Sequence, residues 1–189
     1  MKLYILINSS ETCPGSFESQ LDKKGLETAD KIITKIDTNI GNIYSSPFLS
    51  SLQTIFPYCK KYNRNVNVEC ALYDKRCSNG IKTHINNYPS HTFGYSYILD
   101  IINPSYNSRI FPNNILMCEE EQDIINRVFP FLNKICNSEC KKNVLIVTHK
   151  NILNYILYFF DRSVNLKEPI EDKFIEIIVS NHDVKPDAY

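Results

Sequence analysis

Short apolar segments alternate with amphipathic segments along this 189-residue chain. Apolar residues that alternate or run without interruption predict strands, whereas apolar residues spaced three and four apart predict helices. The run NVLIVTH is apolar on both faces, which is typical of a strand in the middle of a parallel sheet. These patterns predict strands at 3–7, 42–46, 65–73, 143–149 and 173–180, and helices at 23–36, 48–62, 118–135 and 150–161.

Strands that alternate with helices in this way predict one α/β domain over residues 1–189, a three-layer α/β/α sandwich with a mostly parallel sheet. We expect 3–7, 42–45 and 144–148 to be neighbouring strands. Pro57 should interrupt the helix at 48–62, because proline lacks the N–H group that a helix interior uses. Residues 74–117 have weak periodicity and many aromatic side chains, which indicates a lid-like insertion.

Charge and cysteine usage narrow the class of protein. Lys+Arg and Asp+Glu are both 21, so no net field favours nucleic acid or an anionic membrane as partner. The longest apolar runs, such as ILNYILYFF, are far shorter than the ~20 residues that cross a bilayer, and no leader precedes the first strand. The seven cysteines form no CxxC pair. We therefore expect a cytoplasmic protein with reduced thiols, no metal and no cofactor.

Several segments resemble, in the same order, motifs of the histidine phosphatases. LYILINSSET (3–12) resembles LxLxRHGET, SQLDKKGLETADKI (19–32) resembles LTxxGxxQA, and IYSSPFLSSLQT (43–54) resembles SSPxxRAxxT. NVLIVTHKNILNYIL (143–157) resembles the strand that delivers a second His. Within the superfamily, CEEEQDIINRVFPFLN (118–133) and LYDKRCSNG (72–80) are most similar to the 2,3-bisphosphoglycerate-dependent phosphoglycerate mutases. The resemblance extends from Leu3 to about Val179 and implies a phosphoglycerate-mutase-like fold.

In that family a His after the first strand accepts the phosphoryl group, two Arg and a second His stabilise its charge, and an acid protonates the leaving oxygen. The resemblance matches these roles to Ser9 (nucleophile), Asn8 and Ser50 (the two Arg), Asp74 (the acid), His149 (the second His) and Asn151 (an Asn of the mutases). A neutral side chain thus takes the place of the nucleophile and of both Arg. His149 and Asp74 would be vestigial catalytic residues, and Asn8, Ser50 and Asn151 would line the old phosphate pocket.

Loss of a catalytic nucleophile costs on the order of 10⁶ in kcat in a well-studied protease. The sequence therefore predicts a catalytically inactive pseudoenzyme with a binding or regulatory role. An alternative is a weak phosphatase or phosphomutase that acts on small phosphoesters through the altered site, with Ser9 as nucleophile and His149 as its base. The expected partner is a small phosphorylated ligand or a protein: a second copy, or an active paralogue.

Local alternatives stay open at each retained residue. His149 fits either a residual ligand contact or a strand-end histidine held by hydrogen bonds, and Asp74 fits either a proton donor or an exposed loop acid. We expect Asn151 to cap the following helix rather than to contact a ligand. A further group of cations could attract phosphate or could be solvated surface: Lys75, Arg76 and Lys150.

Overall fold

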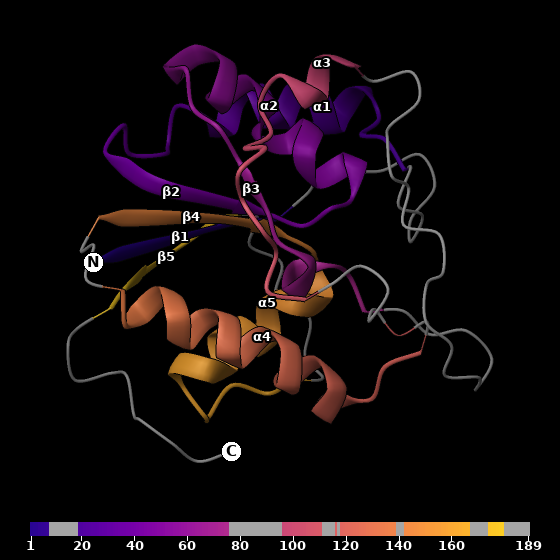
Figure 1. Cartoon of the computed structure of the whole chain (residues 1–189), viewed down its shortest axis with the longest axis vertical. Coiled ribbons are helices and arrows are strands. Elements are labelled where there is room, and N and C mark those ends of the chain that lie inside the picture. The colour runs from indigo at the N-terminus through magenta and orange to yellow at the C-terminus, as the bar shows by residue number, and fades with distance from the viewer. Residues whose placement is uncertain are drawn as a thin grey trace.

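The computed structural model describes residues 1–7, 19–75, 96–110, 116, 118–138, 142–166 and 174–179. A five-stranded sheet lies at its centre, in the order β3-β2-β4-β1-β5 (Figure 1). β5 is antiparallel to β1, and the other neighbouring strands are parallel. The strands are β1 (Lys2–Ile7), β2 (Ile40–Ser45), β3 (Asn67–Val68), β4 (Asn143–Thr148) and β5 (Phe174–Ile178).

Helices cover both faces of the sheet. Figure 1 shows one layer of helices above the sheet and a second layer below it. Above lie α1 (Lys23–Ile32), α2 (Leu49–Tyr62) and the short α3 (Ser96–Leu99), and below lie α4 (Glu121–Cys136) and α5 (Lys150–Phe160). A separate apolar cluster fills the space between the sheet and each layer. The predicted three-layer α/β/α sandwich is confirmed.

β4 occupies the centre of the sheet because both of its faces are apolar. Its residues Leu145, Ile146 and Val147 are fully buried. Leu145 pairs with Ile43 of β2 on one side, and the strand is paired with β1 on the other. The prediction that these three strands are neighbours is therefore confirmed.

Two predicted elements differ most from the structure. α2 continues through Pro57 from Leu49 to Tyr62, so the expected interruption is wrong. A proline removes one helical hydrogen bond, and here the buried face of α2 offsets that loss. The predicted strand at 65–73 is confined to Asn67–Val68, because Glu69 turns the chain into a 3-10 helix (Cys70–Leu72) by accepting a hydrogen bond from the Ala71 N–H at 2.9 Å.

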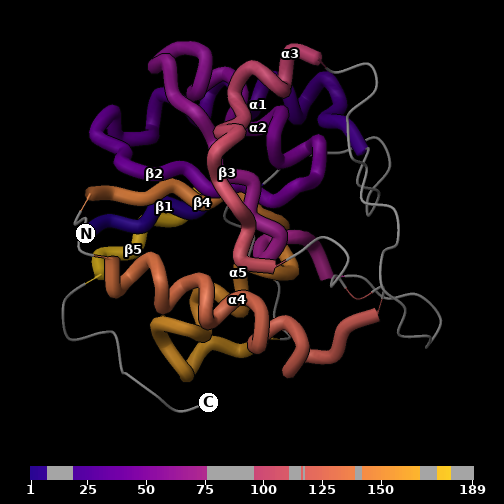
Figure 2. The backbone as a smooth tube through the Cα atoms, viewed as in Figure 1, coloured from indigo at the N-terminus to yellow at the C-terminus, as the bar shows by residue number. Residues whose placement is uncertain are grey.

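The described part of the predicted insertion, 96–110, packs against the body of the domain. Figure 2 shows it running from α3 beside β3 toward the lower helices. Ile98 and Ile101 are buried, and the Val66 N–H donates to the Ile101 carbonyl at 2.7 Å. Residues 76–95, 111–115 and 117, which the prediction of a lid also covers, lie outside the described residues.

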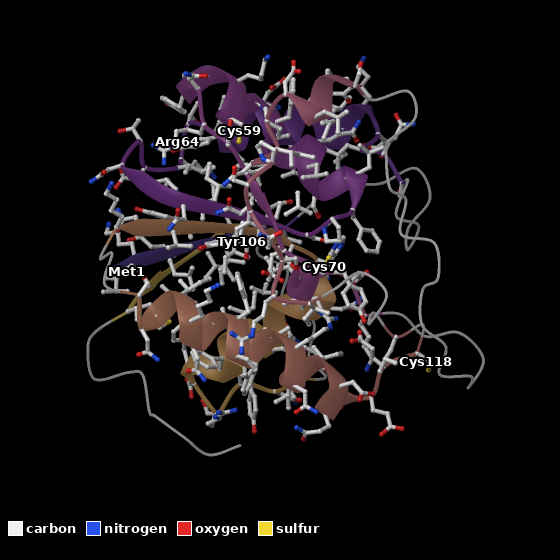
Figure 3. All side chains as sticks on the ribbon, viewed as in Figure 1. Met1, Cys59, Arg64, Cys70, Tyr106 and Cys118 are labelled. Atoms are coloured by element: carbon white, nitrogen blue, oxygen red, sulfur yellow. The ribbon has the colours of Figure 1, made fainter. Side chains whose placement is uncertain are left out.

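The buried Glu69 carboxylate anchors this segment. It accepts hydrogen bonds from the Tyr106 hydroxyl at 2.5 Å, the Ser108 hydroxyl at 2.8 Å and the Arg109 N–H at 3.1 Å. Figure 3 labels Tyr106 in the middle of the molecule, between the two helical layers. Burial is the main cause that raises the pKa of Tyr106, and the hydrogen bond with Glu69 raises it further. The hydroxyl therefore stays protonated and donates to the carboxylate.

The described cysteines do not form disulfides with one another. Cys59, Cys70, Cys118 and Cys136 are free thiols, and Figure 3 shows the first three well separated. Burial raises the pKa of Cys59 to about 12, which keeps its thiol protonated at neutral pH. None of the described helices has the length and apolar character to cross a membrane.

A buried ion pair lies at the N-terminal end of α4, and its arginine also contacts the segment that follows β3. The Arg127 guanidinium meets the Glu119 carboxylate through two hydrogen bonds of 2.7 and 2.9 Å, and both side chains are almost fully buried. Arg127 also donates to the Ala71 carbonyl and lies 3.8 Å from the Tyr73 ring centre. The pair therefore holds the turn that leads into Asp74.

We predict that Arg127→Met lowers the free energy of unfolding by about 3–5 kcal/mol, because Glu119 would keep a buried charge without its partner. Urea unfolding measures the change. The double variant Arg127→Met/Glu119→Gln serves as the control, since it removes both charges and should recover part of the loss. A single variant that loses less than about 1 kcal/mol would contradict the prediction.

Candidate functional site

Chain segments that carry three of the predicted site residues, Asp74, His149 and Asn151, meet at the carboxyl end of β4. Thr148 ends that strand, and its hydroxyl donates to the Leu72 carbonyl at 2.8 Å. This bond brings the turn at Tyr73–Asp74 beside the start of α5. In open α/β sheets ligands bind beyond the carboxyl ends of the strands, so this is the expected place for a site.

His149 follows Thr148 and is held on several sides. It is only 4% exposed. Its Nε2 lies 2.8 Å from the Ser46 hydroxyl and 3.4 Å from the Ser51 hydroxyl. The Phe48 ring packs edge-on against the imidazole, with 4.5 Å between ring centres. These contacts agree with the interpretation of His149 as a strand-end histidine fixed by hydrogen bonds.

Asp74 and Asn151 are in direct contact. The Asn151 side-chain amide donates to Asp74 Oδ1 at 3.1 Å, and the Lys75 N–H donates to the same oxygen at 2.9 Å. The expectation that Asn151 caps α5 is wrong. The N-cap of α5 is His149, whose carbonyl accepts from the Ile152 and Leu153 N–H groups, and Asn151 already lies inside the helix.

Of the remaining predicted residues, Ser50 is described and the others are not. Ser50 is fully buried in the first turn of α2, and its carbonyl accepts from the Thr54 hydroxyl at 2.8 Å. Asn8 and Ser9 lie outside the described residues, as does Arg76. The convergence of Ser9, Ser50, Asp74 and His149 on one pocket therefore stays a prediction.

Sequence reasoning missed the two serines that contact His149. Ser46 follows β2 and Ser51 belongs to α2, and both are fully buried. The paired serines at 45–46 and 50–51 were the available signal. A motif resemblance identifies only residues at positions that the family motif specifies. The contacts of Ser46 and Ser51 with His149 depend instead on how α2 packs over the end of β4.

A cavity of about 510 Å³ lies next to the contact between Asp74 and Asn151. Its lining is mixed: two lysines, one carboxylate, two amides, a phenol and an aliphatic side chain. The residues are Lys75, Glu121, Lys150, Asn151, Asn154, Tyr155 and Leu166. No group of three or more His, Cys, Asp or Glu side chains within the described ranges is arranged to hold a metal ion.

Solved structures of several phosphatases have the same fold as this chain. The alpha-ribazole phosphatase of Shigella flexneri superposes with a TM-score of 0.64 at 15% identity, over 96% of this chain and 92% of the phosphatase. The glucosyl-3-phosphoglycerate phosphatase of a mycobacterium gives 0.60 at 15% identity, over 93% and 91%. The ecdysone phosphate phosphatase of Bombyx mori, in complex with tungstate, gives 0.61 at 11% identity, over 90% and 81%.

No family model matches the sequence, and no curated protein does. The similarity therefore lies in the fold, at identities of 11 to 15%. This chain has the fold of the histidine phosphatase superfamily, as the sequence motifs predicted.

We predict that Ser46→Ala lowers the free energy of unfolding by about 1–2 kcal/mol, because it removes the shorter of the two hydroxyl contacts from a buried imidazole. Ser51→Ala is the matched control and should cost less, since its hydroxyl lies 3.4 Å from Nε2. Urea unfolding of both variants measures the two losses in the free energy of unfolding. Equal losses would mean that the distance to His149 is not what matters.

Proposed function

We propose that this protein is a phosphoglycerate-mutase-like pseudoenzyme, a histidine phosphatase fold that binds a ligand or partner without phosphoryl transfer through histidine. The observation that carries the proposal is the state of His149, which is 4% exposed with Nε2 in contact with two serine hydroxyls. The motif resemblance adds that Ser9 stands where the family has its nucleophile.

His149 is poorly placed to replace the missing nucleophile. An imidazole attacks phosphorus through an exposed, unprotonated ring nitrogen. Here the Ser46 hydroxyl lies against Nε2 at hydrogen-bond distance, and Phe48 packs on the ring. An attack through Nε2 would first require the loss of that hydrogen bond and movement of the ring out of its packing.

The electrostatics of the old phosphate position also favour inactivity. Phosphoryl transfer depends on cations that stabilise charge on three equatorial oxygens. Asn8 and Ser50 take the places of the two Arg in the motif resemblance, and Ser50 is fully buried. Neutral donors at these places would hold a phosphoryl group much more weakly than guanidinium groups do.

A second candidate function is a weak phosphatase that acts on small phosphoesters through the altered site. One observation favours it: Ser46 Oγ lies 2.8 Å from His149 Nε2, within the range of a serine nucleophile and its base. Ser46 is fully buried, however, so a substrate could reach it only after rearrangement. A phosphoserine ester would also hydrolyse slowly once formed.

We predict that the purified protein releases no phosphate from a panel of small phosphomonoesters above the buffer blank. It should also show no phosphohistidine after incubation with 2,3-bisphosphoglycerate. Phosphate release and intact-mass spectrometry are the measurements. Turnover near 1–10³ s⁻¹, the ordinary enzyme range, would contradict the proposal. If that turnover disappeared in Ser9→Ala or Ser46→Ala, the serine lost would be the working nucleophile.

A reconstruction makes the same test in the opposite direction. Asn8→Arg/Ser9→His restores the nucleophile and one Arg of the motif, and should raise phosphate release above that of the parent chain. Adding Ser50→Arg completes the motif, but an arginine at this fully buried position should also destabilise α2. The two-residue variant therefore keeps the test valid if the three-residue variant does not fold. No gain in a folded two-residue variant would mean that the scaffold itself has lost competence.

A further inference from the structure

Residues 104–110, called the strap below, cross the domain body between β3 and the lower helices (Figure 2). Burial alternates along the strap, so every second side chain faces the body. The half-buried residues are Tyr106, Ser108 and Ile110, and the exposed residues between them are Asn107 and Arg109. Two of the three inward side chains carry hydroxyl groups, so the face of the strap that lies on the body is mainly polar.

The residues just before the strap are fixed to the body. Ile101 is buried, and Ile102 forms a parallel bridge with Val66. The Asn103 N–H donates to the Val66 carbonyl at 2.9 Å, and the Asn103 side-chain amide donates to Asn67 Oδ1 at 2.8 Å. The strap therefore starts from a fixed point beside β3.

The strap itself is attached in a different way. All of its residues are described and none of them is buried. Three donors from Tyr106–Arg109 meet one carboxylate, that of Glu69. The Tyr106 ring adds an edge-on contact with Tyr44, with 5.7 Å between ring centres. Segments with few buried apolar contacts open locally while the rest of a protein stays folded, and the strap has this character.

Glu69 and the strap together hold the start of the 3-10 helix at Cys70–Leu72. Glu69 Oε1 accepts from the Ala71 N–H at 2.9 Å, and Ser108 Oγ accepts from the Cys70 N–H at 2.8 Å. N–H groups at the start of a helix have no acceptor within the helix, so they depend on such side chains. Figure 3 labels Tyr106 on the strap and Cys70 on this turn, both in the middle of the molecule.

The same turn leads to Asp74. Asp74 follows the 3-10 helix by two residues, and its Oδ1 accepts from the Asn151 side-chain amide at 3.1 Å. Two carbonyls of the 3-10 helix accept hydrogen bonds from the body, one from Arg127 and one from Thr148. The body therefore holds the acceptors of the turn, whereas Glu69 and the strap hold its first donors.

Lifting the strap would remove three of the four hydrogen bonds that the described residues donate to the Glu69 carboxylate. A buried carboxylate with a single donor is costly, so the side chain would turn toward water and release the Ala71 N–H. The Cys70 N–H would lose Ser108 at the same time. Both first donors of the 3-10 helix would then be without their acceptors.

We propose that the strap is a conformational switch for the turn at Asp74, with Glu69 as the positioning residue that links the two. With the strap docked, the 3-10 helix is held and Asp74 stays against Asn151. With the strap lifted, the start of that helix opens and Asp74 separates from Asn151. This coupling goes beyond the proposed function and does not depend on it, because the turn places Asp74 whether or not the protein is catalytic.

The test is amide hydrogen exchange of the full chain, measured by NMR, in Tyr106→Phe. This variant removes one hydroxyl from Glu69 and touches neither the Cys70 nor the Ala71 N–H. Exchange at those two amides should nevertheless rise about three- to tenfold, as expected for loss of one hydrogen bond in a coupled unit. The side-chain amide resonance of Asn151 should shift, which reports its contact with Asp74.

Tyr97→Phe is the matched control, because it makes the same change elsewhere in the 96–110 segment. The Tyr97 hydroxyl accepts from Gln53 at 3.0 Å on α2, and its loss should leave the Cys70 and Ala71 amides unchanged. Ser108→Asp should act in the same direction as Tyr106→Phe and more strongly, since it sets a second carboxylate against Glu69. If Ser108→Asp does not fold, Tyr106→Phe still makes the test.

Three results would overturn the proposal. Unchanged exchange at Cys70 and Ala71 in Tyr106→Phe would mean that the strap is passive. An equal rise at Leu145 in the centre of β4 would mean that the variant lowers global stability and that the effect is not confined to the turn. An unshifted Asn151 side-chain resonance, with faster exchange at the turn, would break the link to Asp74. Phosphate release is not a readout here, so failure of this proposal is distinct from failure of the proposed function.

Discussion

The burial of β4 is the constraint on which the rest of the structure depends. Its side chains are apolar on both faces, so the strand can satisfy them only in the middle of a sheet that has helices on both sides. β1 and β2 must then lie on either side of it. The carboxyl end of β4 brings His149 and the start of α5 to one edge of the sheet, next to the turn at Asp74.

The polar residues at this edge are used mainly to hold the structure together. Ser46 and Ser51 contact the imidazole of His149, and Thr148 binds the Leu72 carbonyl. Below the sheet, the buried pair of Arg127 and Glu119 supports the same turn.

Two lysines in the described part of the chain lie to one side of the strand end. Lys75 and Lys150 line a cavity that Tyr155 and Glu121 also reach.

The sequence by itself determined the fold class, the central position of β4 and the place of His149 at its end. Each follows from local apolar periodicity and from motif order, which a linear chain displays directly. Only the tertiary structure decided that α2 runs through Pro57 and that the 65–73 segment turns at Glu69 after two strand residues. It also decided which serines meet the imidazole. These outcomes depend on packing and hydrogen bonds between residues that are distant in sequence, and those energies override local preference.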